Sequence, residues 1–235
     1  MDFFSRILAG FTLGFRYRRE LKRLLTKNTS KTTLQSKNMS SPSASIGDPA
    51  LKSGFPITPS GMTDNLLIEP WSAASILNLD PADLMAKGIQ ALALDFDGVL
   101  AHHGAAAPLP EAVDWIRRCE ALLGGERIFI LSNKPTDERR LWFAENFPAI
   151  RFIAGVRKKP YPDGLNKTGE LTGVPLSSIL MVDDRLLTGC LAALITGATP
   201  CYIRKPYISF SHRFGAELFF ILLRSCERFY ILSST

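Results

Sequence analysis

The sequence predicts an α/β fold with a doubly wound parallel sheet, and three observations support this prediction. Short apolar runs, typical of buried strands, alternate with stretches of helical character from about residue 66 onward. Such alternation favours a parallel sheet whose two faces are covered by helices. Acidic and other polar residues directly follow three of the apolar runs, at the edge where parallel sheets hold ligands.

The individual elements follow from helix caps, apolar runs and helix-ending residues. Asp80 stands before Pro81 as an N-cap, and Thr136 is expected to cap a helix with acidic residues in its first turn. Gly124 and Pro148 end helices. In chain order we expect a helix after Asp80, a strand at 91–95, a helix at 111–123, a strand at 127–131, a helix after Thr136, strands at 151–154, 178–182 and 200–203, and helices near 163–172 and 186–196.

The positive charge of the chain is concentrated in its N-terminal part. Residues 1–38 contribute +7 to a net charge of +6, so the remainder is close to neutral. Residues 1–25 form a basic amphipathic segment with helical spacing of apolar side chains, which fits the surface of an anionic membrane. A solvated basic helix and an organelle transit peptide remain as alternatives. Residues 26–63 have the composition of a flexible linker, and residues 64–235 are expected to form one catalytic domain.

Cysteine usage and the C-terminal apolar stretch restrict the environment of the chain. The four cysteines lie far apart without a CxxC pair, which indicates free thiols in a reducing compartment and not a disulfide or metal framework. The apolar stretch at 214–232 carries several charges and is therefore not expected to span a bilayer. It is expected either to pack on the core or to lie at a membrane interface.

Seven polar residues are expected to meet at the carboxyl edge of the sheet. Alternate residues of a strand point to opposite faces, so a bend after the first strand must turn two carboxylates toward one centre. Crowded carboxylates require a cation, and their hard oxygens suit Mg²⁺. A lysine and a serine hydroxyl supply positive charge and a donor to phosphoryl oxygens. The candidates are Asp95 and Asp97, Ser132 and Asn133, Lys159, and Asp183 and Asp184.

In this order, the DxDGVL sequence, the Ser-Asn pair, the Lys-Pro pair and the Asp-Asp pair resemble the haloacid dehalogenase (HAD) superfamily of aspartate-nucleophile phosphohydrolases. The resemblance covers roughly residues 66–210 and implies a HAD-like Rossmannoid core. The roles that it implies are Asp95 as the nucleophile, Asp97 as the general acid and base, Ser132, Asn133 and Lys159 as phosphate-binding residues, and Asp95, Asp97, Asp183 and Asp184 as ligands of Mg²⁺.

The spacing of these residues leaves no room for a cap domain. Only 34 residues lie between Asp97 and Ser132, and 26 between Ser132 and Lys159, and the expected helix–strand units occupy both intervals. Cap domains close over small substrates and exclude water. An open site therefore favours a large substrate, such as a protein, a nucleic-acid end or a lipid headgroup in a membrane.

Within the superfamily, the chain resembles the capless phosphatidylglycerophosphate phosphatases of mitochondria and related bacterial proteins. The similar segments are Gly88–Asp95, Lys158-Lys159-Pro160 and Leu186-Leu187-Thr188. In two departures, Asp183 stands where that group has a glycine, and Gly189 stands where it has a further acid. The resemblance implies an anionic phospholipid substrate, or another large phosphorylated one. It also implies membrane association on a reducing face, either the bacterial cytoplasmic side or the matrix or stroma side of an inner membrane.

Two other functions remain as alternatives. The first is a HAD phosphatase that acts on nucleic-acid ends or on phosphoprotein, although the near-neutral body lacks the basic stripe that nucleic acid favours. The second is a catalytically inactive HAD-like scaffold, although every motif residue is present. The sequence does not indicate an oligomeric state.

Basic residues and histidines next to the motifs allow two interpretations each. Arg157, Lys158 and Arg185 either bind a doubly phosphorylated anion or form a solvated basic rim. His102 and His103 either hold the leaving group or belong to a polar loop.

Overall fold

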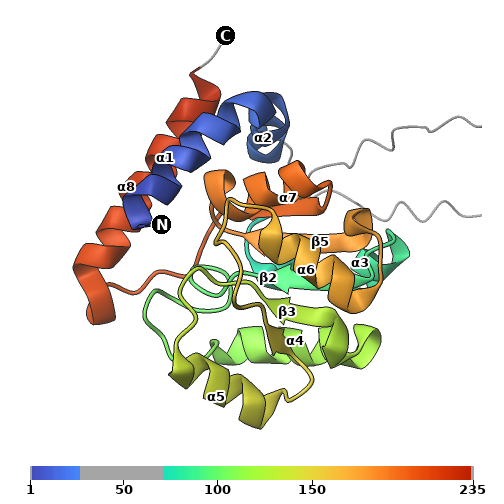
Figure 1. Ribbon diagram of the computed structural model, residues 1–235. Coiled ribbons are helices and arrows are strands. Elements are labelled where there is room, and N and C mark those ends of the chain that lie inside the picture. Colours follow the sequence, from blue (N-terminus) through green and yellow to red (C-terminus); the bar gives the residue numbers. More distant parts are fainter. Residues whose placement is uncertain (1, 27–70, 234–235) are drawn as a thin grey trace, which may run out of the picture. The chain divides into compact units, whose positions relative to one another are not determined.

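The computed structural model describes residues 2–26 and 71–233 (Figure 1). The linker predicted over residues 26–63 lies, from residue 27 on, outside the described residues.

Six parallel strands form one open sheet in the order β1-β6-β5-β2-β3-β4. The chain leaves the central strand β2 toward β3 on one side and returns to β5 on the other, so the strand order reverses at β2. Open α/β sheets bind ligands at such a switch point. The predicted parallel sheet is thereby confirmed. The strands are β1 (Trp71–Ala73), β2 (Ala91–Leu94), β3 (Ile128–Ile130), β4 (Arg151–Phe152), β5 (Ile179–Asp183) and β6 (Thr199–Ile203).

Helices cover both faces of the sheet, as expected for a doubly wound fold (Figure 1). Leu92 and Leu94 of β2 pack in one apolar cluster with α3, α4 and α5. Ala91 and Ala93 point to the opposite face and pack in a second cluster with α6 and α7. This alternation explains why β2 is apolar throughout. The helices are α3 (Pro81–Ala86), α4 (Pro110–Leu123), α5 (Asp137–Asn146), α6 (Asp163–Thr172) and α7 (Leu191–Thr196).

Local capping explains where the helices begin. The Asp80 carboxylate accepts a 2.8 Å hydrogen bond from the backbone N–H of Ala82. The Thr136 hydroxyl accepts one of 3.4 Å from Arg139. Both caps agree with the prediction. The segment predicted as one helix over 186–196 instead begins with a turn of π-helix, Leu186–Cys190. Strand β1 was not predicted, because a strand of three residues is too short to show a clear hydrophobic pattern.

The N-terminal segment is helical and packs within the same compact unit as the sheet. It forms α1 (Phe3–Gly14) and α2 (Arg18–Thr26), which contact the long C-terminal helix α8 (Phe210–Leu232). Leu21 and Leu24 have no exposed surface and join a third apolar cluster with residues of α7, α8 and the π-helical turn. Part of the apolar face predicted to meet a membrane is therefore buried against the protein itself.

All four cysteines lie among the described residues, where they are free thiols. Three are buried, while Cys226 is exposed. Across residues 2–26 and 71–233, no helix has both the length and the apolar character that crossing a bilayer requires.

Candidate active site

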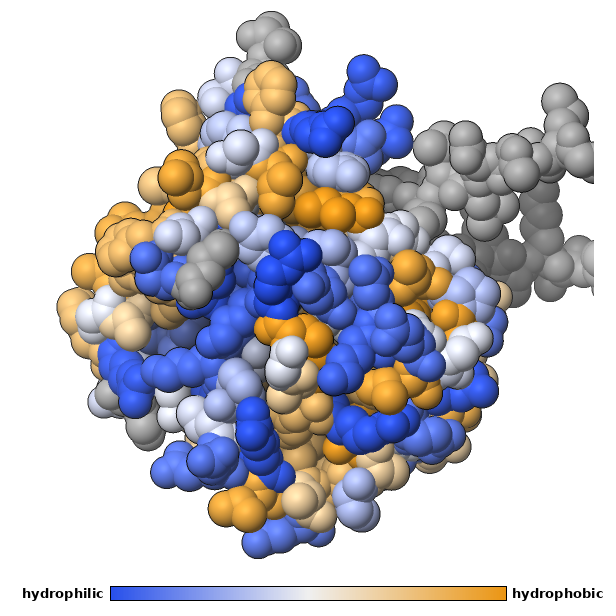
Figure 2. Space-filling model, viewed as in Figure 1, coloured by the Kyte–Doolittle hydropathy of each residue, from blue (hydrophilic) through white to orange (hydrophobic). Residues whose placement is uncertain are grey.

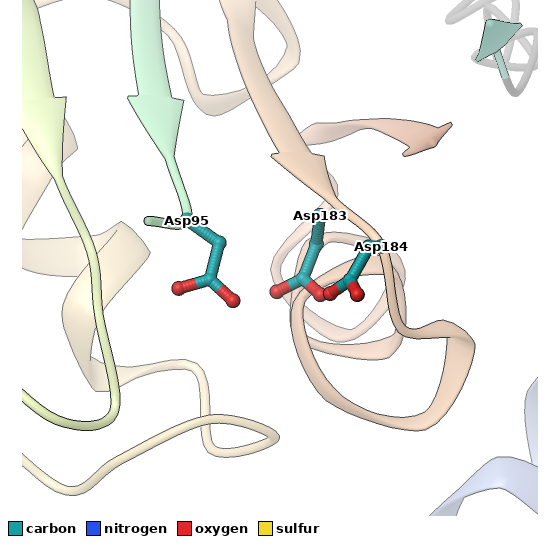
Figure 3. Close-up of side chains that lie close together, drawn as sticks. All are labelled: Asp95, Asp183 and Asp184. Atoms are coloured by element: carbon teal, nitrogen blue, oxygen red, sulfur yellow. The ribbon is translucent and has the colours of Figure 1, made fainter. Parts of the chain in front are cut away.

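Three aspartates converge at the carboxyl ends of β2 and β5 (Figure 3). Asp95 follows β2 directly, and its backbone N–H donates to Val182 of β5 at 2.9 Å. Asp183 is the last residue of β5, and Asp184 follows it. One carboxylate oxygen from each of the three lies within 4.8 Å of the others. Adjacent parallel strands therefore bring together three acids that are distant in the chain, and this group could hold a metal ion.

Lys159 lies buried between two of these carboxylates. Its Nζ is 3.1 Å from Asp95 Oδ2 and 2.6 Å from Asp183 Oδ2, and only 2% of its side chain is exposed. Burial alone would lower the pKa of Lys159, but Asp183 and Asp95 raise that pKa above its usual value. Lys159 is thus held as a cation at the base of the site.

The charge of Lys159 does not fully offset the crowding of the acids. Burial raises the pKa of Asp95 to about 7, and Asp183, Asp184 and Asp97 add to this rise, while Lys159 opposes it. Burial also raises the pKa of Asp184, which Arg224 partly offsets. A divalent cation would favour the ionised form of these carboxylates, and three oxygen donors match the preference of Mg²⁺. The donor set therefore fits this ion.

Asn133 positions Lys159 through two hydrogen bonds. Its Nδ2 donates to the Lys159 carbonyl at 3.2 Å, and its Oδ1 accepts from the Lys159 backbone N–H at 2.9 Å. Ser132, at the end of β3, is mostly buried, and its hydroxyl accepts a 3.1 Å hydrogen bond from Lys134. The two residues predicted after the second strand thus line the same pocket as Lys159, and the Asn133 side chain holds the lysine loop.

Asp97 lies apart from the three clustered carboxylates. Both of its oxygens accept hydrogen bonds from Arg139, at 2.7 and 3.0 Å. Arg139 is itself buried and stacks on the Phe96 ring at 3.9 Å. The metal-ligand role predicted for Asp97 stays a prediction, since its side chain is paired with Arg139 here. No local sequence signal points to Arg139, because its contact with Asp97 spans 42 residues.

A pocket of about 500 Å³ opens above these groups. Its lining includes six of the seven predicted residues, and Asp183, fully buried, is the exception. Of the flanking cations, Lys158 and Arg185 line the pocket. Arg157 is not part of the lining and pairs with Asp163 at 2.9 Å. Two of the three flanking cations therefore lie at the pocket, where they could meet a bound anion, and the third does not.

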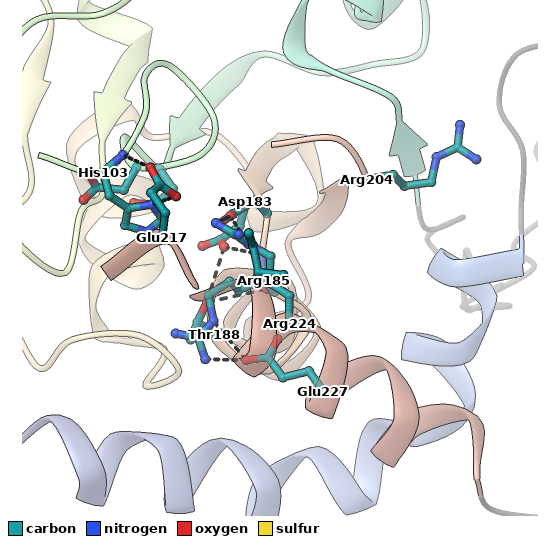
Figure 4. Close-up of polar contacts among 12 residues, drawn as sticks. His103, Asp183, Arg185, Thr188, Arg204, Glu217, Arg224 and Glu227 are labelled. Atoms are coloured by element: carbon teal, nitrogen blue, oxygen red, sulfur yellow. Dashed lines mark hydrogen bonds and ion pairs between the residues drawn. The ribbon is translucent and has the colours of Figure 1, made fainter. Parts of the chain in front are cut away.

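The C-terminal helix α8 braces the site with three buried charged residues (Figure 4). Glu217 pairs with His103 at 3.2 Å, and Arg224 donates to Asp184 at 2.7 Å. Glu227 accepts from Arg185 and, at 3.1 Å, from the backbone N–H of Leu186. These contacts were not predicted, although the spacing of residues 217, 224 and 227 places all three on one face of a helix.

The two histidines have different environments. His103 lines the pocket and stacks on Phe220 with ring centroids 4.0 Å apart. His102 does not belong to the lining, and its Nδ1 lies 3.3 Å from the carbonyl of His103. Of the pair, His103 is therefore the one placed to contact a substrate.

Two glycines allow the acids to pack closely. Gly98 has a φ of +82°, and a Cβ there would lie 2.3 Å from Asp184 Oδ2. A Cβ on Gly189 would lie 2.1 Å from Asp183 Oδ2. The space at Gly189 is therefore taken by the Asp183 side chain, so the two departures from the phosphatidylglycerophosphate phosphatase pattern are sterically linked.

Comparison with known proteins agrees with this arrangement. The sequence pattern of the family described as mitochondrial PGP phosphatase (PGP, phosphatidylglycerophosphate) matches residues 62–208. No curated protein matches the chain. One similar solved structure is an uncharacterized protein from Corynebacterium glutamicum, with 21% identity, a TM-score of 0.39, and coverage of 59% of this chain and 96% of that one. Because the family match spans more than half of the sequence, this chain belongs to the mitochondrial PGP phosphatase family and is a phosphatase.

Proposed function

We propose that the chain is a Mg²⁺-dependent phosphomonoesterase that converts PGP to phosphatidylglycerol at a membrane surface. The observation that carries this proposal is the group of Asp95, Asp183 and Asp184 around the buried Lys159. Family membership supports PGP as the substrate and an association with mitochondria. The absence of a cap-sized insertion between the motifs supports a large substrate.

The reaction would proceed in two displacements at phosphorus. An Asp95 oxygen attacks the terminal phosphorus, the bond from phosphorus to the glycerol oxygen breaks, and Asp97 gives its proton to the leaving alcohol. Asp97 then takes a proton from water, whose oxygen attacks the aspartyl-phosphate and releases inorganic phosphate. Before the first displacement, Asp97 must carry a proton, so its contact with Arg139 has to loosen.

The surrounding residues would bind the phosphoryl group. Ser132 and Lys159 offer donors to its oxygens, and Asn133 holds the lysine in place. Mg²⁺ held by Asp95, Asp183 and Asp184 would neutralise charge on the transferring phosphoryl group.

An exposed apolar surface beside the pocket supports action at a membrane. Hydrophobic side chains gather over α1 and α8 (Figure 2), including Phe4, 76% exposed, and Phe229, 74% exposed. Phe3 and Ile7 of α1 and Phe220 of α8 also line the pocket. Exposed aromatic and aliphatic side chains with nearby arginines fit an anionic bilayer. Acyl chains could then stay in the membrane while the headgroup reaches Asp95.

Phosphate release from PGP in mixed liposomes tests the proposal. We expect release that requires Mg²⁺ and falls at least about a thousandfold in Asp95→Asn, because the nucleophile is lost. A thermal melt checks that the variant is folded. A 3′-phosphorylated oligonucleotide and a phosphopeptide are assayed in parallel. Release from either of these and not from the lipid would contradict the substrate, and near-wild-type activity of Asp95→Asn would contradict the mechanism.

A further inference from the structure

The N-terminal helix forms one wall of the catalytic pocket. Phe3, Arg6 and Ile7 of α1 line the pocket together with Lys158 and Arg185 from the catalytic loops. Phe3 contacts Phe219 and Phe220 of α8 at ring-centroid distances of 5.7 and 6.3 Å, which helps to seat this end of the helix. The half-buried Arg6 therefore presents a cation to the pocket from a segment distant from all the motifs.

Arg6 and Lys158 differ from three other cations of the pocket because they lack carboxylate partners, a property that they share with Lys134 and Arg213 among the described lining residues. Lys159 pairs with Asp95 and Asp183. Arg185 and Arg139 each pair with an acid as well. Within the described part of the chain, no carboxylate lies within ion-pair distance of Arg6 or Lys158.

Neighbouring positive charge disfavours the charged form of both cations. Burial and the charge of Arg185 lower the pKa of Arg6, which the charge of Asp2 partly offsets, while burial and the charge of Arg6 lower the pKa of Lys158. A bound anion would remove this repulsion. Arg6 Nε donates to the Asp2 carbonyl at 3.3 Å, but neither cation has a carboxylate at ion-pair distance, and such cations suit the oxygens of a phosphate.

We infer that Arg6 and Lys158 form a second anion subsite, which binds the phosphodiester of the substrate while the terminal phosphate lies at Asp95. This inference rests on the proposed function. In PGP the diester is the phosphate closer to the acyl chains. Arg6 stands on the helix that carries the exposed Phe4 and Leu8, so the subsite lies on the side of the pocket next to the apolar surface. Along the lipid, the diester lies between the terminal phosphate and the acyl chains. Along the protein, the subsite likewise lies between Asp95 and the apolar surface.

Comparing a substrate that carries the diester with one that lacks it tests the subsite. Short-chain PGP and p-nitrophenyl phosphate are hydrolysed by the full chain, by Arg6→Gln and by Lys158→Gln. We expect kcat/KM on PGP to fall at least about tenfold more than kcat/KM on p-nitrophenyl phosphate, mainly through KM. The matched control is Arg19→Gln, which removes the same charge from an exposed position of α2 outside the pocket lining. Arg6→Lys should recover part of the loss.

Equal losses on both substrates, or no loss on either, would overturn the subsite. A compound that has the diester but no terminal phosphate tests the subsite independently of the proposed function. Glycerophosphoglycerol should inhibit hydrolysis of p-nitrophenyl phosphate by the wild-type chain, and Arg6→Gln should weaken that inhibition about tenfold. If wild-type enzyme fails to hydrolyse PGP yet shows this inhibition, the proposed substrate is wrong and the subsite stands. Inhibition that is unchanged in Arg6→Gln overturns the subsite alone.

Discussion

At the scale of single residues, the packing of the site carboxylates depends on the missing side chain at position 189 as much as on the acids themselves. A Cβ at position 189 would lie 2.1 Å from Asp183 Oδ2. The space between these two positions can therefore hold only one carboxylate. A carboxylate can reach it from position 183, as here, or from position 189 when position 183 is a glycine. The two arrangements are thus alternative ways to place an acid at the same point.

This steric link leads to a prediction about a double substitution. Asp183→Gly should abolish Mg²⁺-dependent hydrolysis, and Gly189→Asp alone should impair folding, because its side chain collides with Asp183. The double variant, D183G with G189D, should recover at least about a tenth of the wild-type activity. Activity is measured as phosphate release, and metal binding as the Mg²⁺-dependent rise in melting temperature. A double variant no better than Asp183→Gly would contradict the shared volume.

The sequence was sufficient to predict which residues meet at the edge of the sheet, because strand ends and parallel pairing are local and regular features. Asp95, Lys159 and Asp184 all line the pocket, as the strand order requires. Their partners were not predictable in the same way. Arg139 reaches Asp97 across 42 residues, and nothing in the local sequence around either residue specifies such a pairing.

At the scale of elements, α8 differs from the apolar helix that its composition indicates. Its exposed face is aromatic, whereas its buried face carries Glu217, Arg224 and Glu227 toward the catalytic loops. The buried face agrees with the predicted packing on the core, and a membrane interface at the exposed face stays a prediction. The charges that argued against a membrane-spanning helix are paired inside the protein.

The buried charge pairs of α8 predict a large effect of a conservative change. Glu227→Gln leaves the Arg185 guanidinium without its carboxylate, and unpaired buried charges of this kind cost about 3 kcal/mol. We expect the melting temperature to fall by about 6 °C or more. Catalysis should fall too, since the backbone after Asp184 loses an acceptor. The control is Glu170→Gln, which changes an exposed glutamate of α6. Similar melts for the two variants would refute this bracing role.

At the scale of the whole molecule, the first and last helices lie together and frame the pocket. Phe11 of α1 contacts Tyr230 of α8 with ring centroids 4.9 Å apart, and the Tyr230 hydroxyl donates to the Phe11 carbonyl at 2.9 Å. A membrane interface was considered for each end of the chain separately, with no contact between the two ends expected. Their contact was not predictable, because it joins residues 219 positions apart.

The apolar surface of these helices predicts a separable defect in membrane binding. The double variant F4Q with L8Q removes two exposed apolar side chains of α1 that do not line the pocket. Each loss should weaken binding to anionic liposomes about tenfold, since burying such a side chain is worth about 1.5–3 kcal/mol. Hydrolysis of p-nitrophenyl phosphate should persist. Leu141→Gln, at a 63% exposed leucine of α5, is the control. If the wild type, the double variant and Leu141→Gln bind liposomes equally, this surface does not contribute to membrane binding.

The burial of Leu21 and Leu24 has a consequence for how the chain tolerates cleavage. A cut anywhere between residues 26 and 71 would leave the first two helices held to the rest of the protein by a shared apolar cluster. The nicked chain would then be a complex of two fragments. If processing instead released residues 3–26, the body would lose a pocket wall and expose the core beneath it. We therefore expect removal of residues 3–26 to lower both the phosphatase activity and the melting temperature of the protein.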